Sequence, residues 1–286
     1  MPVVDVSGLT FTYAAGTSPA IRNLSFQIDR GEIFGFLGPN GAGKSTTQKL
    51  LVRLLRGYEG TVSVLGHDLA EWGAKYYEEI GVSFEQPNHY LRLTGSENLS
   101  YFRRLYLGRT RQPDELLEMV GLAGEGDRRV AQYSKGMKTR LSVARALLND
   151  PQLIFMDEPT AGLDPVGGRR IRTLIRELKE AGRTVFLTTH DMTVAGELCD
   201  RVAFLVAGEM PIVGSPAALK LVHGSRTVAI EYHLHGSPGR REFPLDGLHA
   251  NAAFLALLRD ATINTLHTQE ATLEDVFLRV TGRGLG

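Results

Sequence analysis

The chain has 286 residues, of which 43% are hydrophobic and 22% charged, a composition typical of a folded globular protein rather than a disordered chain or a coiled coil. Its 32 basic and 32 acidic side chains balance, which argues against a dedicated nucleic-acid-binding protein because such proteins carry a basic excess. A single cysteine, Cys199, no run of about 18 apolar residues and no secretion signal together predict a soluble chain in a reducing, intracellular compartment.

The first half of the chain predicts strands and then helices. Short β-rich runs in residues 1–37 are separated by Gly, Pro and Asn turn signals. A helix is predicted after the GPNGAGKST run, because leucines recur there at helical spacing, namely Leu50, Leu51, Leu54 and Leu55. Residues 88–150 are predicted to be mostly helical, since capping residues precede several apolar periodic segments.

Beyond Pro151 the pattern changes back to strands. LIFMD and TVFLTTH are short apolar runs bounded by turn residues, as in buried parallel strands. Between them, RRIRTLIRELKEAGR is an amphipathic helix, and a further helix and strand follow. Strands that alternate with crossover helices predict an α/β domain over residues 1–223, with a helical insertion at about 88–150.

The last part of the chain, residues 224–286, is predicted to be a small α+β appendage. TVAIEYHLHG and REFPL are predicted to form a hairpin, and TINTLHT is a possible further strand. NAAFLALLRD and TLEDVFLRVTG are predicted helices. This appendage is expected to regulate the protein or stabilise a dimer, and no particular residue decides between the two roles.

A phosphate-binding loop is the strongest motif. The pattern G-x-x-x-x-G-K-[ST] is matched in full, after a predicted strand and at the start of a helix. Backbone N–H groups of such a loop and the helix N-terminus bind phosphate, the lysine reaches the β- and γ-phosphates, and the serine hydroxyl ligates Mg²⁺. A chance glycine-rich turn is the alternative, which the strand–loop–helix context disfavours. The expected nucleotide-binding residues are Gly38, Pro39, Asn40, Gly41, Ala42, Gly43, Lys44, Ser45 and Thr46.

Two acidic residues follow the LIFM run and supply the second half of an ATPase site. Asp157 closes the predicted strand at its carboxyl end, where α/β sheets bind ligands, and is expected to reach the same Mg²⁺. Glu158 is the expected general base that accepts a proton from the attacking water. These elements predict a nucleoside triphosphatase. A GTPase is disfavoured because no Asn-Lys dipeptide occurs, whereas a small-molecule kinase would also fit the length.

A third motif resembles a known family. Tyr133-Ser134-Lys135-Gly136-Met137, about twenty residues before LIFMDEP, is similar to the Leu-Ser-Gly-Gly-Gln signature of ABC transporter ATPases, although it departs from that form at three of five positions. The resemblance covers about residues 3–222. It implies a RecA-like phosphate-loop core with an N-terminal antiparallel β-subdomain. It also implies that the signature serves the ATP of a second subunit, through Ser134, Lys135, Gly136 and Met137.

The same resemblance implies roles for four more residues. Tyr13 would stack on the adenine ring, and Gln86 would contact Mg²⁺ or the attacking water and sense the γ-phosphate. His190, at the end of TVFLTTH, would bond the γ-phosphate and hold Glu158 in place. Asp164 would connect the two sites of a dimer. Taken alone, a tyrosine such as Tyr13 is more often a half-buried strand residue, a histidine at a strand end is usually structural, and Gln86 is weak evidence; the family context favours the functional roles.

The likeness further implies a transporter subunit. Only 113 residues separate Lys44 from Asp157, too few for the long coiled coil of repair and chromosome ATPases, and the chain has one cassette. The signature, residues 85–99 and residues 272–278 resemble the type 2 (daunorubicin-resistance-like) exporters of drugs, polysaccharides, lipids and sodium. The implied partners are a second copy or a related ATPase subunit and separate membrane permease subunits, without nucleic acid, on the cytoplasmic face of the cell membrane.

Several alternatives stay open at this point. A soluble ABC-type mechanical or regulatory ATPase would share the site but act on a protein other than a permease, and a nucleotide-binding protein with slow hydrolysis would explain the atypical signature. His233 and His235 share one face of a predicted strand and suit a metal less well than an exposed surface. The permease contact is expected in residues 87–110, where lobe packing is the competing role of Tyr90, Leu91, Tyr101 and Phe102.

Overall fold

The computed structural model describes residues 2–223, 227–234, 236–269 and 271–282. The chain divides into two compact units after Ser215. The helix α8 (Pro216–His223) groups with the second unit because it packs on α10 (Leu273–Thr281), where Arg279 Nη1 donates a hydrogen bond to the His223 carbonyl at 3.0 Å. The boundary between the two compact units therefore lies eight residues before residue 223, where the sequence analysis ends the ATP-binding domain. The separate roles assigned to the two parts of the chain stay predictions.

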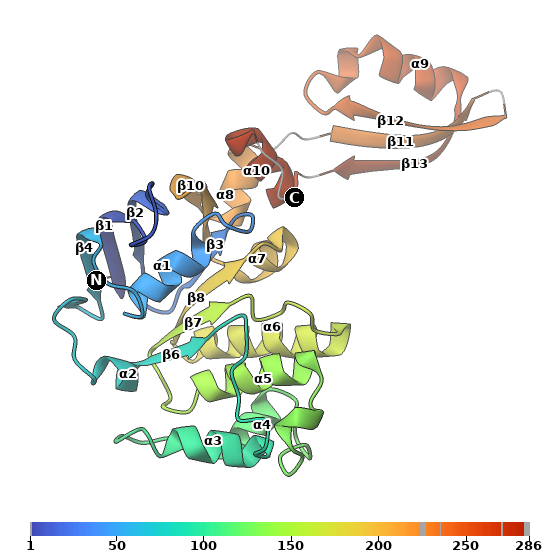
Figure 1. Cartoon of the computed structure of the whole chain (residues 1–286). Helices are drawn as coiled ribbons and strands as arrows, with labels where there is room; N and C mark the ends of the chain where they lie inside the picture. The colour runs from blue at the N-terminus through green and yellow to red at the C-terminus, as the bar shows by residue number, and fades with distance from the viewer. Residues whose placement is uncertain (1, 224–226, 235, 270, 283–286) are drawn as a thin grey trace. The chain divides into compact units, whose positions relative to one another are not determined.

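The first unit is built on a six-stranded sheet (Figure 1). Its five parallel strands are apolar and mostly buried on both faces, as covered parallel strands must be, and one antiparallel strand closes an edge. In spatial order the strands are β10 (Glu209–Gly214), β9 (Arg201–Val206), β3 (Ile33–Leu37), β8 (Thr184–Thr189), β7 (Leu153–Asp157) and β6 (Ile80–Ser83).

The register of this sheet brings three loops to one edge. Leu37 pairs with Thr189, and Asp157 pairs with Thr188, so β3, β8 and β7 end at the same level. Because the strands are parallel, the loops that follow them emerge side by side at their carboxyl ends. The phosphate loop follows β3, the loop after β7 begins with Glu158, and the loop after β8 begins with His190.

A smaller antiparallel sheet, with strands before and after β3 in the chain, packs beside the core sheet in the first unit. Its strands show the burial alternation of a sheet with one covered face; in β2, for example, every buried residue is apolar. Phe26 stacks on Phe34 with ring centroids 5.7 Å apart, and the apolar side chains of both sheets form one continuous cluster. In spatial order the strands are β2 (Ile21–Ile28), β1 (Val4–Phe11), β4 (Glu59–Val64) and β5 (His67–Asp68).

Helices complete the first unit. The helix α6 buries four apolar residues at helical spacing and begins at the cap residue Asp164, whose carboxylate accepts from Gly167 N. Three helices form the predicted insertion, and Thr94 opens the first of them with a capping box to Glu97. The helices are α1 (Lys44–Leu51), α2 (Tyr76–Glu79), α3 (Gly95–Arg103), α4 (Pro113–Met119), α5 (Lys135–Ala146), α6 (Pro165–Glu180) and α7 (Met192–Leu198).

The second unit combines the α8–α10 pair with a three-stranded antiparallel sheet, in the order β12-β11-β13, on which one helix packs. Val228 and Ile230 of the central strand pack with Phe243, Phe254 and Leu257 in a small core. The elements are β11 (Thr227–Leu234), β12 (Ser237–Pro244), α9 (Ala252–Asp260) and β13 (Thr262–Gln269). The hairpin, the possible strand and both helices predicted for this part of the chain are present.

Candidate nucleotide site

The phosphate loop joins β3 to α1 in a conformation that requires glycine. Gly43, the cap residue of α1, has φ +110°, and a Cβ added there would lie 2.7 Å from Ile21 Cδ1. A Cβ on Gly38 would lie 2.1 Å from the carbonyl oxygen of Leu205, inside van der Waals contact. The absence of side chains at these positions lets the loop pack tightly against the sheet and leaves its backbone N–H groups to face a ligand.

Lys44 is held over the loop by backbone carbonyls. Its ammonium donates to Gly38 O at 2.7 Å and to Pro39 O at 3.1 Å, and only 6% of the residue is exposed. Burial lowers the pKa of Lys44, whereas the negative charges of Glu158 and Asp157 act in the opposite direction. A cation in this position is placed to bind a polyanion.

The carboxylate of Asp157 accepts hydrogen bonds from two hydroxyl groups. Ser45 Oγ donates to Asp157 Oδ1 at 3.3 Å, and Thr188 Oγ1 donates to the same oxygen. The serine comes from α1 and the carboxylate from the end of β7, so the sheet brings together residues that lie 112 positions apart. A hydroxyl and a carboxylate in contact form an oxygen donor set of the kind that suits Mg²⁺.

Glu158 is positioned through both its backbone and its side chain. Its φ is +48°, an uncommon conformation for a residue with a side chain, and its N–H donates to Thr188 O at 3.0 Å. Oε2 accepts from Thr189 Oγ1 at 3.0 Å, and Oε1 lies 2.7 Å from His190 Nδ1. The Glu158 side chain is 7% exposed and His190 is 55% exposed, so one buried carboxylate is bonded to an imidazole that faces solvent.

The two threonines at the end of β8 were missed by the sequence reasoning. Thr188 and Thr189 are both buried, and they hold Asp157 and Glu158 respectively. A signal was available, because two hydroxyl residues at the end of an apolar strand need buried hydrogen-bond acceptors. Only the pairing of β8 with β7 identifies those acceptors as the two acidic residues.

Tyr13 and Gln86 differ in how the structure connects them to the phosphate loop. Tyr13 is 41% exposed, packs edge-on against Phe11, and its hydroxyl lies 3.0 Å from Thr46 Oγ1. Its ring therefore lies close to the loop, with an exposed surface. Gln86 is exposed three residues beyond the end of β6, and within the described residues no hydrogen bond joins it to Asp157.

The signature residues lie against the segment that follows Glu158. Ser134 is the cap of α5 and accepts from Met137 N at 3.2 Å. A Cβ on Gly136 would lie 3.2 Å from Leu163 Cδ2, and the Lys135 side chain lies near Gly162. The Ser134 hydroxyl and the N-terminus of α5 thus lie beside residues 162–164. The last of these residues, Asp164, caps α6.

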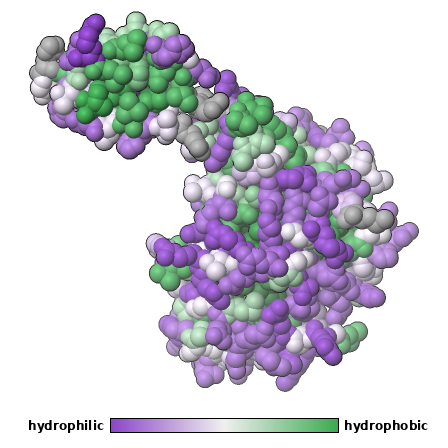
Figure 2. Space-filling model, turned by 180° about the vertical axis from the view of Figure 1, so that it is seen from behind, coloured by the Kyte–Doolittle hydropathy of each residue, from purple (hydrophilic) through white to green (hydrophobic). Residues whose placement is uncertain are grey.

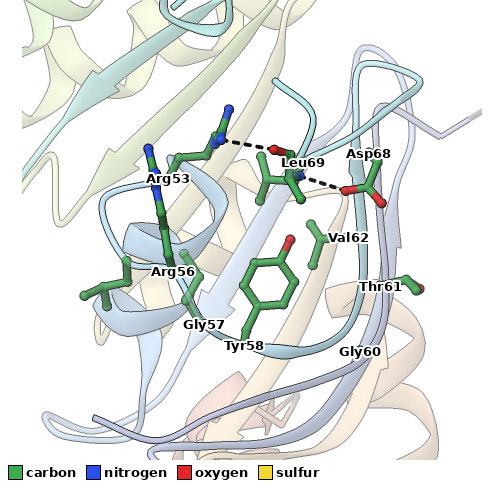
Figure 3. Close-up of a pocket in the computed structure, with 12 residues that line it drawn as sticks. Arg53, Arg56, Gly57, Tyr58, Gly60, Thr61, Val62, Asp68 and Leu69 are labelled. Atoms are coloured by element: carbon green, nitrogen blue, oxygen red, sulfur yellow. Dashed lines mark hydrogen bonds between the residues drawn. The ribbon is translucent and has the colours of Figure 1, made fainter. Parts of the chain in front are cut away.

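Two other features lie outside this site. His233 Nδ1 bonds to the side chain of Asn264, whereas His235 lies outside the described residues, among which no group of three His, Cys, Asp or Glu residues is arranged to hold a metal. A cavity of about 370 Å³ beside the end of α1 is lined by Arg53 and Tyr58, among others (Figure 3), and by none of the predicted nucleotide-binding residues.

The sequence matches known proteins over nearly the whole chain. Residues 21–161 match the family model described as ABC transporter, and residues 226–270 match the fluoroquinolone efflux ABC transporter C-terminal domain. A fluoroquinolones export ATP-binding protein of Mycobacterium tuberculosis is 54% identical, over 99% of this chain and 94% of its own length. Nod factor export ATP-binding protein I of Rhizobium meliloti is 38% identical, over 99% of this chain and 89% of its own length.

The structural likeness agrees with these matches. A dimeric ATP-binding cassette in a post-hydrolysis state, bound to ADP and Pi, superimposes with a TM-score of 0.68 at 30% identity, over 74% of this chain and 98% of that structure. The predicted fold, a phosphate-loop α/β core with an antiparallel β-subdomain and a helical insertion, is confirmed, and the small-molecule kinase alternative is excluded. Within the described residues, no helix is long and apolar enough to cross a membrane. The chain belongs to the ATP-binding subunits of ABC transporters and is an ABC ATPase.

Proposed function

We propose that this chain binds and hydrolyses ATP to power an ABC exporter through separate membrane permease subunits. The observation that carries the proposal is the Glu158 carboxylate, bonded to His190 on one oxygen and to Thr189 on the other, at the sheet edge that also bears the phosphate loop. A general base must be held in a fixed direction to act on one water molecule, and this carboxylate has a partner on each oxygen.

ATP is bound by the phosphate loop. The ammonium of Lys44 exchanges its bonds to Gly38 and Pro39 for bonds to the β- and γ-phosphates, and backbone N–H groups at the start of α1 add further donors. The exposed ring of Tyr13, close to Thr46, stacks on the adenine at the outer end of the nucleotide. Gly38, Asn40, Gly41, Ala42 and Gly43 complete the cradle.

Ser45, Asp157 and Gln86 would hold Mg²⁺. The contact between the serine hydroxyl and the carboxylate supports this assignment, because both groups are hard oxygen ligands. When bound, the ion neutralises charge on the phosphates. Thr188 donates to Asp157 and so keeps that carboxylate turned toward Ser45.

Hydrolysis uses Glu158 as the base. Its oxygens accept a proton from the attacking water while Thr189 and His190 restrict rotation of the carboxylate. His190 is the more exposed partner, so its free ring nitrogen is available to the γ-phosphate. The loss of the γ-phosphate then removes the group that His190 contacts.

Two chains close head to tail, and each ATP lies between the phosphate loop of one copy and the signature of the other. The N-terminus of α5, with Ser134, Lys135, Gly136 and Met137, binds the phosphates of the second copy's nucleotide. Asp164 lies directly after residues that touch the signature, which supports its role in communication between the two sites. The similarity to a dimeric cassette supports this arrangement.

The permease subunits contact a set of exposed aromatic and apolar side chains in residues 87–110, at the cytoplasmic face of the membrane. Tyr90, Leu91 and Tyr101 are each about half exposed, and the rings of Tyr90 and Tyr101 lie 4.9 Å apart. Arg145 lies over the ring of Phe102 at 4.7 Å and fixes its orientation. Because a relative at 54% identity is a fluoroquinolones export ATP-binding protein, drugs of that class are the transported compounds to test first.

The test is the solution mass of the Glu158→Gln chain by light scattering, with and without ATP. The variant is expected to double its mass with ATP only, because nucleotide is bound and not hydrolysed, and its phosphate release should fall about 10²- to 10⁴-fold. Unchanged phosphate release would remove Glu158 from the mechanism. A variant that binds ATP and stays monomeric would contradict closure of two copies without other subunits.

A further inference from the structure

The loop that joins α3 to α4 carries the most exposed large hydrophobic side chain among the described residues. Leu107 is 96% exposed and Leu105 is 64% exposed, whereas leucine side chains in folded proteins are mostly buried. The side of the first unit that is seen in Figure 2 is largely hydrophilic. Two leucines exposed to this degree in one short loop therefore need an explanation.

The exposure of Leu107 is built into the backbone of the loop. The carboxylate of Glu78 accepts from Leu107 N at 3.0 Å through one oxygen and from Gly108 N at 3.2 Å through the other. Further along the loop, Arg111 N donates to Leu148 O at 2.8 Å. Because the backbone is anchored on both sides, the leucine side chain is held outward.

Positive charge surrounds the two leucines. Four of the nine residues 103–111 are arginines and none is acidic. Arg111 forms an ion pair with Asp150 at 2.8 Å. Arg104 and Arg109 are exposed, and in the part of the chain that the structure describes no acidic side chain forms an ion pair with either of them. The exposed leucines thus lie beside cations that have no counter-charge in the protein.

The apolar surface continues next to the loop. Tyr106 lines a cavity of about 200 Å³ together with Tyr77 and Leu54, among others. Tyr77 is 43% exposed and Leu54 is 58% exposed, and Tyr77 directly precedes Glu78, which anchors the loop. The leucines are therefore part of a wider apolar surface.

We propose that this loop contacts the surface of a lipid bilayer that contains anionic headgroups. Leu105 and Leu107 enter the boundary between headgroups and acyl chains, and Arg104 and Arg109 bind the phosphate-bearing headgroups. Apolar side chains flanked by basic ones are typical of protein segments that lie in the membrane interface. The inference rests on the proposed function only in placing the chain at the cytoplasmic face of a membrane.

Charge favours lipid over the permease as the partner of this loop. Cytoplasmic loops of membrane proteins carry an excess of Lys and Arg, which repels Arg104 and Arg109, whereas the cytoplasmic leaflet is negatively charged. The permease contact proposed above uses Tyr90, Leu91 and Tyr101. Because Tyr101 lies in the last turn of α3, that contact would bring the following loop close to the membrane.

Binding through this loop alone is expected to be weak. A single myristoyl chain gives an association constant of about 10⁴ M⁻¹, and two leucine side chains bury less apolar surface than that chain. In the assembled transporter the permease holds the loop at the membrane, so even a weak contact is populated. Experiments on the isolated chain therefore need lipid concentrations on the order of mM.

Sedimentation of the full-length chain with vesicles tests the contact without permease or nucleotide. Vesicles of phosphatidylglycerol and phosphatidylcholine in equal parts should bind the chain about tenfold more strongly than vesicles of phosphatidylcholine alone. Arg104→Gln combined with Arg109→Gln should weaken this binding about tenfold, since each arginine near an anionic leaflet contributes about fivefold. Arg169→Gln combined with Arg240→Gln is the matched control, because it removes the same charge from exposed positions elsewhere.

Two results of this experiment would overturn the proposal. One is equal binding to the two kinds of vesicle. The other is an equal loss of binding in the two double variants, because net charge and not the loop would then decide the binding.

A dye on residue 107 tests whether the loop itself enters the interface. The natural cysteine, Cys199, is buried, and burial raises the pKa of its thiol, so a maleimide dye reacts with an introduced cysteine instead. In Leu107→Cys, an environment-sensitive dye should shift its emission to the blue with anionic vesicles. Leu221→Cys is the control, because Leu221 is 71% exposed in α8 of the second unit and its dye should not respond. Unchanged emission at residue 107 would refute insertion of the loop.

Leu107→Gln separates contact with lipid from contact with the permease. Its thermal unfolding and its phosphate release in solution should match those of the unmodified chain, because the side chain is exposed and lies outside the nucleotide site. Its binding to anionic vesicles should fall about tenfold. A Leu107→Gln chain that binds vesicles normally but no longer assembles with permease subunits would overturn the proposal in favour of a protein contact.

These experiments fail independently of the proposed ATPase mechanism. An error in the role of Glu158 would change the expected phosphate release and leave vesicle binding as it is. A chain that hydrolyses ATP and does not bind anionic vesicles would contradict the lipid contact alone.

Discussion

The hydroxyl of Thr189 offers a direct test of how the catalytic carboxylate is held. Thr189 is 1% exposed, donates to Glu158 Oε2 at 3.0 Å, and accepts from Asp191 N at 3.0 Å. Thr189→Val keeps the shape of the side chain and removes both bonds. The carboxylate then keeps one partner, His190, and is free to turn about it.

The size of the effect follows from the lost bond. A hydrogen bond to a charged group contributes about 1.5–3 kcal/mol, and each 1.36 kcal/mol is about tenfold in rate, so kcat should fall about 10- to 100-fold. The KM for ATP should change little, because Thr189 bonds to Glu158 and Asp191, outside the phosphate loop. Thr189→Ser keeps a hydroxyl and should retain most of the activity.

Steady-state phosphate release against ATP concentration measures both constants. Thr184→Val is the matched control: it lies at the other end of β8, is also 1% exposed, and loses a comparable bond, from Gly31 N at 3.0 Å. The reasoning is refuted if Thr189→Val keeps kcat within about twofold, or if Thr184→Val lowers kcat as much.

Two further predictions concern stability. Gly43→Ala should lower the free energy of unfolding by about 1–3 kcal/mol, because φ is +110° and the new Cβ meets Ile21, and urea titration measures the loss. Burial lowers the pKa of His89, whose Nε2 bonds to Lys138 O, from 6.5 to about 4. The unfolded chain then takes up this proton first, so stability should be constant above pH 6.5 and fall on the order of 1–2 kcal/mol between pH 6.5 and 4, partial exposure reducing the full effect.

Each of these two predictions has its own control. Gly41→Ala also places a side chain at positive φ but in open space, so its loss should be smaller than that of Gly43→Ala; equal losses would remove the steric argument. His89→Gln keeps a donor toward Lys138 and has no titration in this range. If its stability falls as steeply as that of the unmodified chain between pH 6.5 and 4, His89 is not the cause.

Much of the site was predictable from short segments of sequence. The phosphate loop, the acidic pair at 157–158 and the cap residue Ser134 are each defined by neighbours along the chain, since the strand–loop–helix turn and the helix cap are local structures. The same holds for α6, whose four buried apolar residues were read from their spacing. These elements required no knowledge of distant contacts.

Contacts between distant segments were decided only by the tertiary structure. Thr188 and Thr189 meet Asp157 and Glu158, each 31 residues away, because β8 pairs with β7 in one particular register. A shift of that register by one residue would turn the hydroxyls to the other face of the sheet. The sequence contains the residues, and the strand pairing creates the contact.

The sequence by itself determined the family and the nucleotide motifs, because both depend on patterns of consecutive residues. Only the tertiary structure decided that α8 packs with α10, that β13 lies at an edge of its sheet, and that Leu266 of β13 stays half exposed. TINTLHTQ would have the same local strand preference in the middle of a sheet. Whether it is covered depends on strand order, which is set by contacts far apart in the chain.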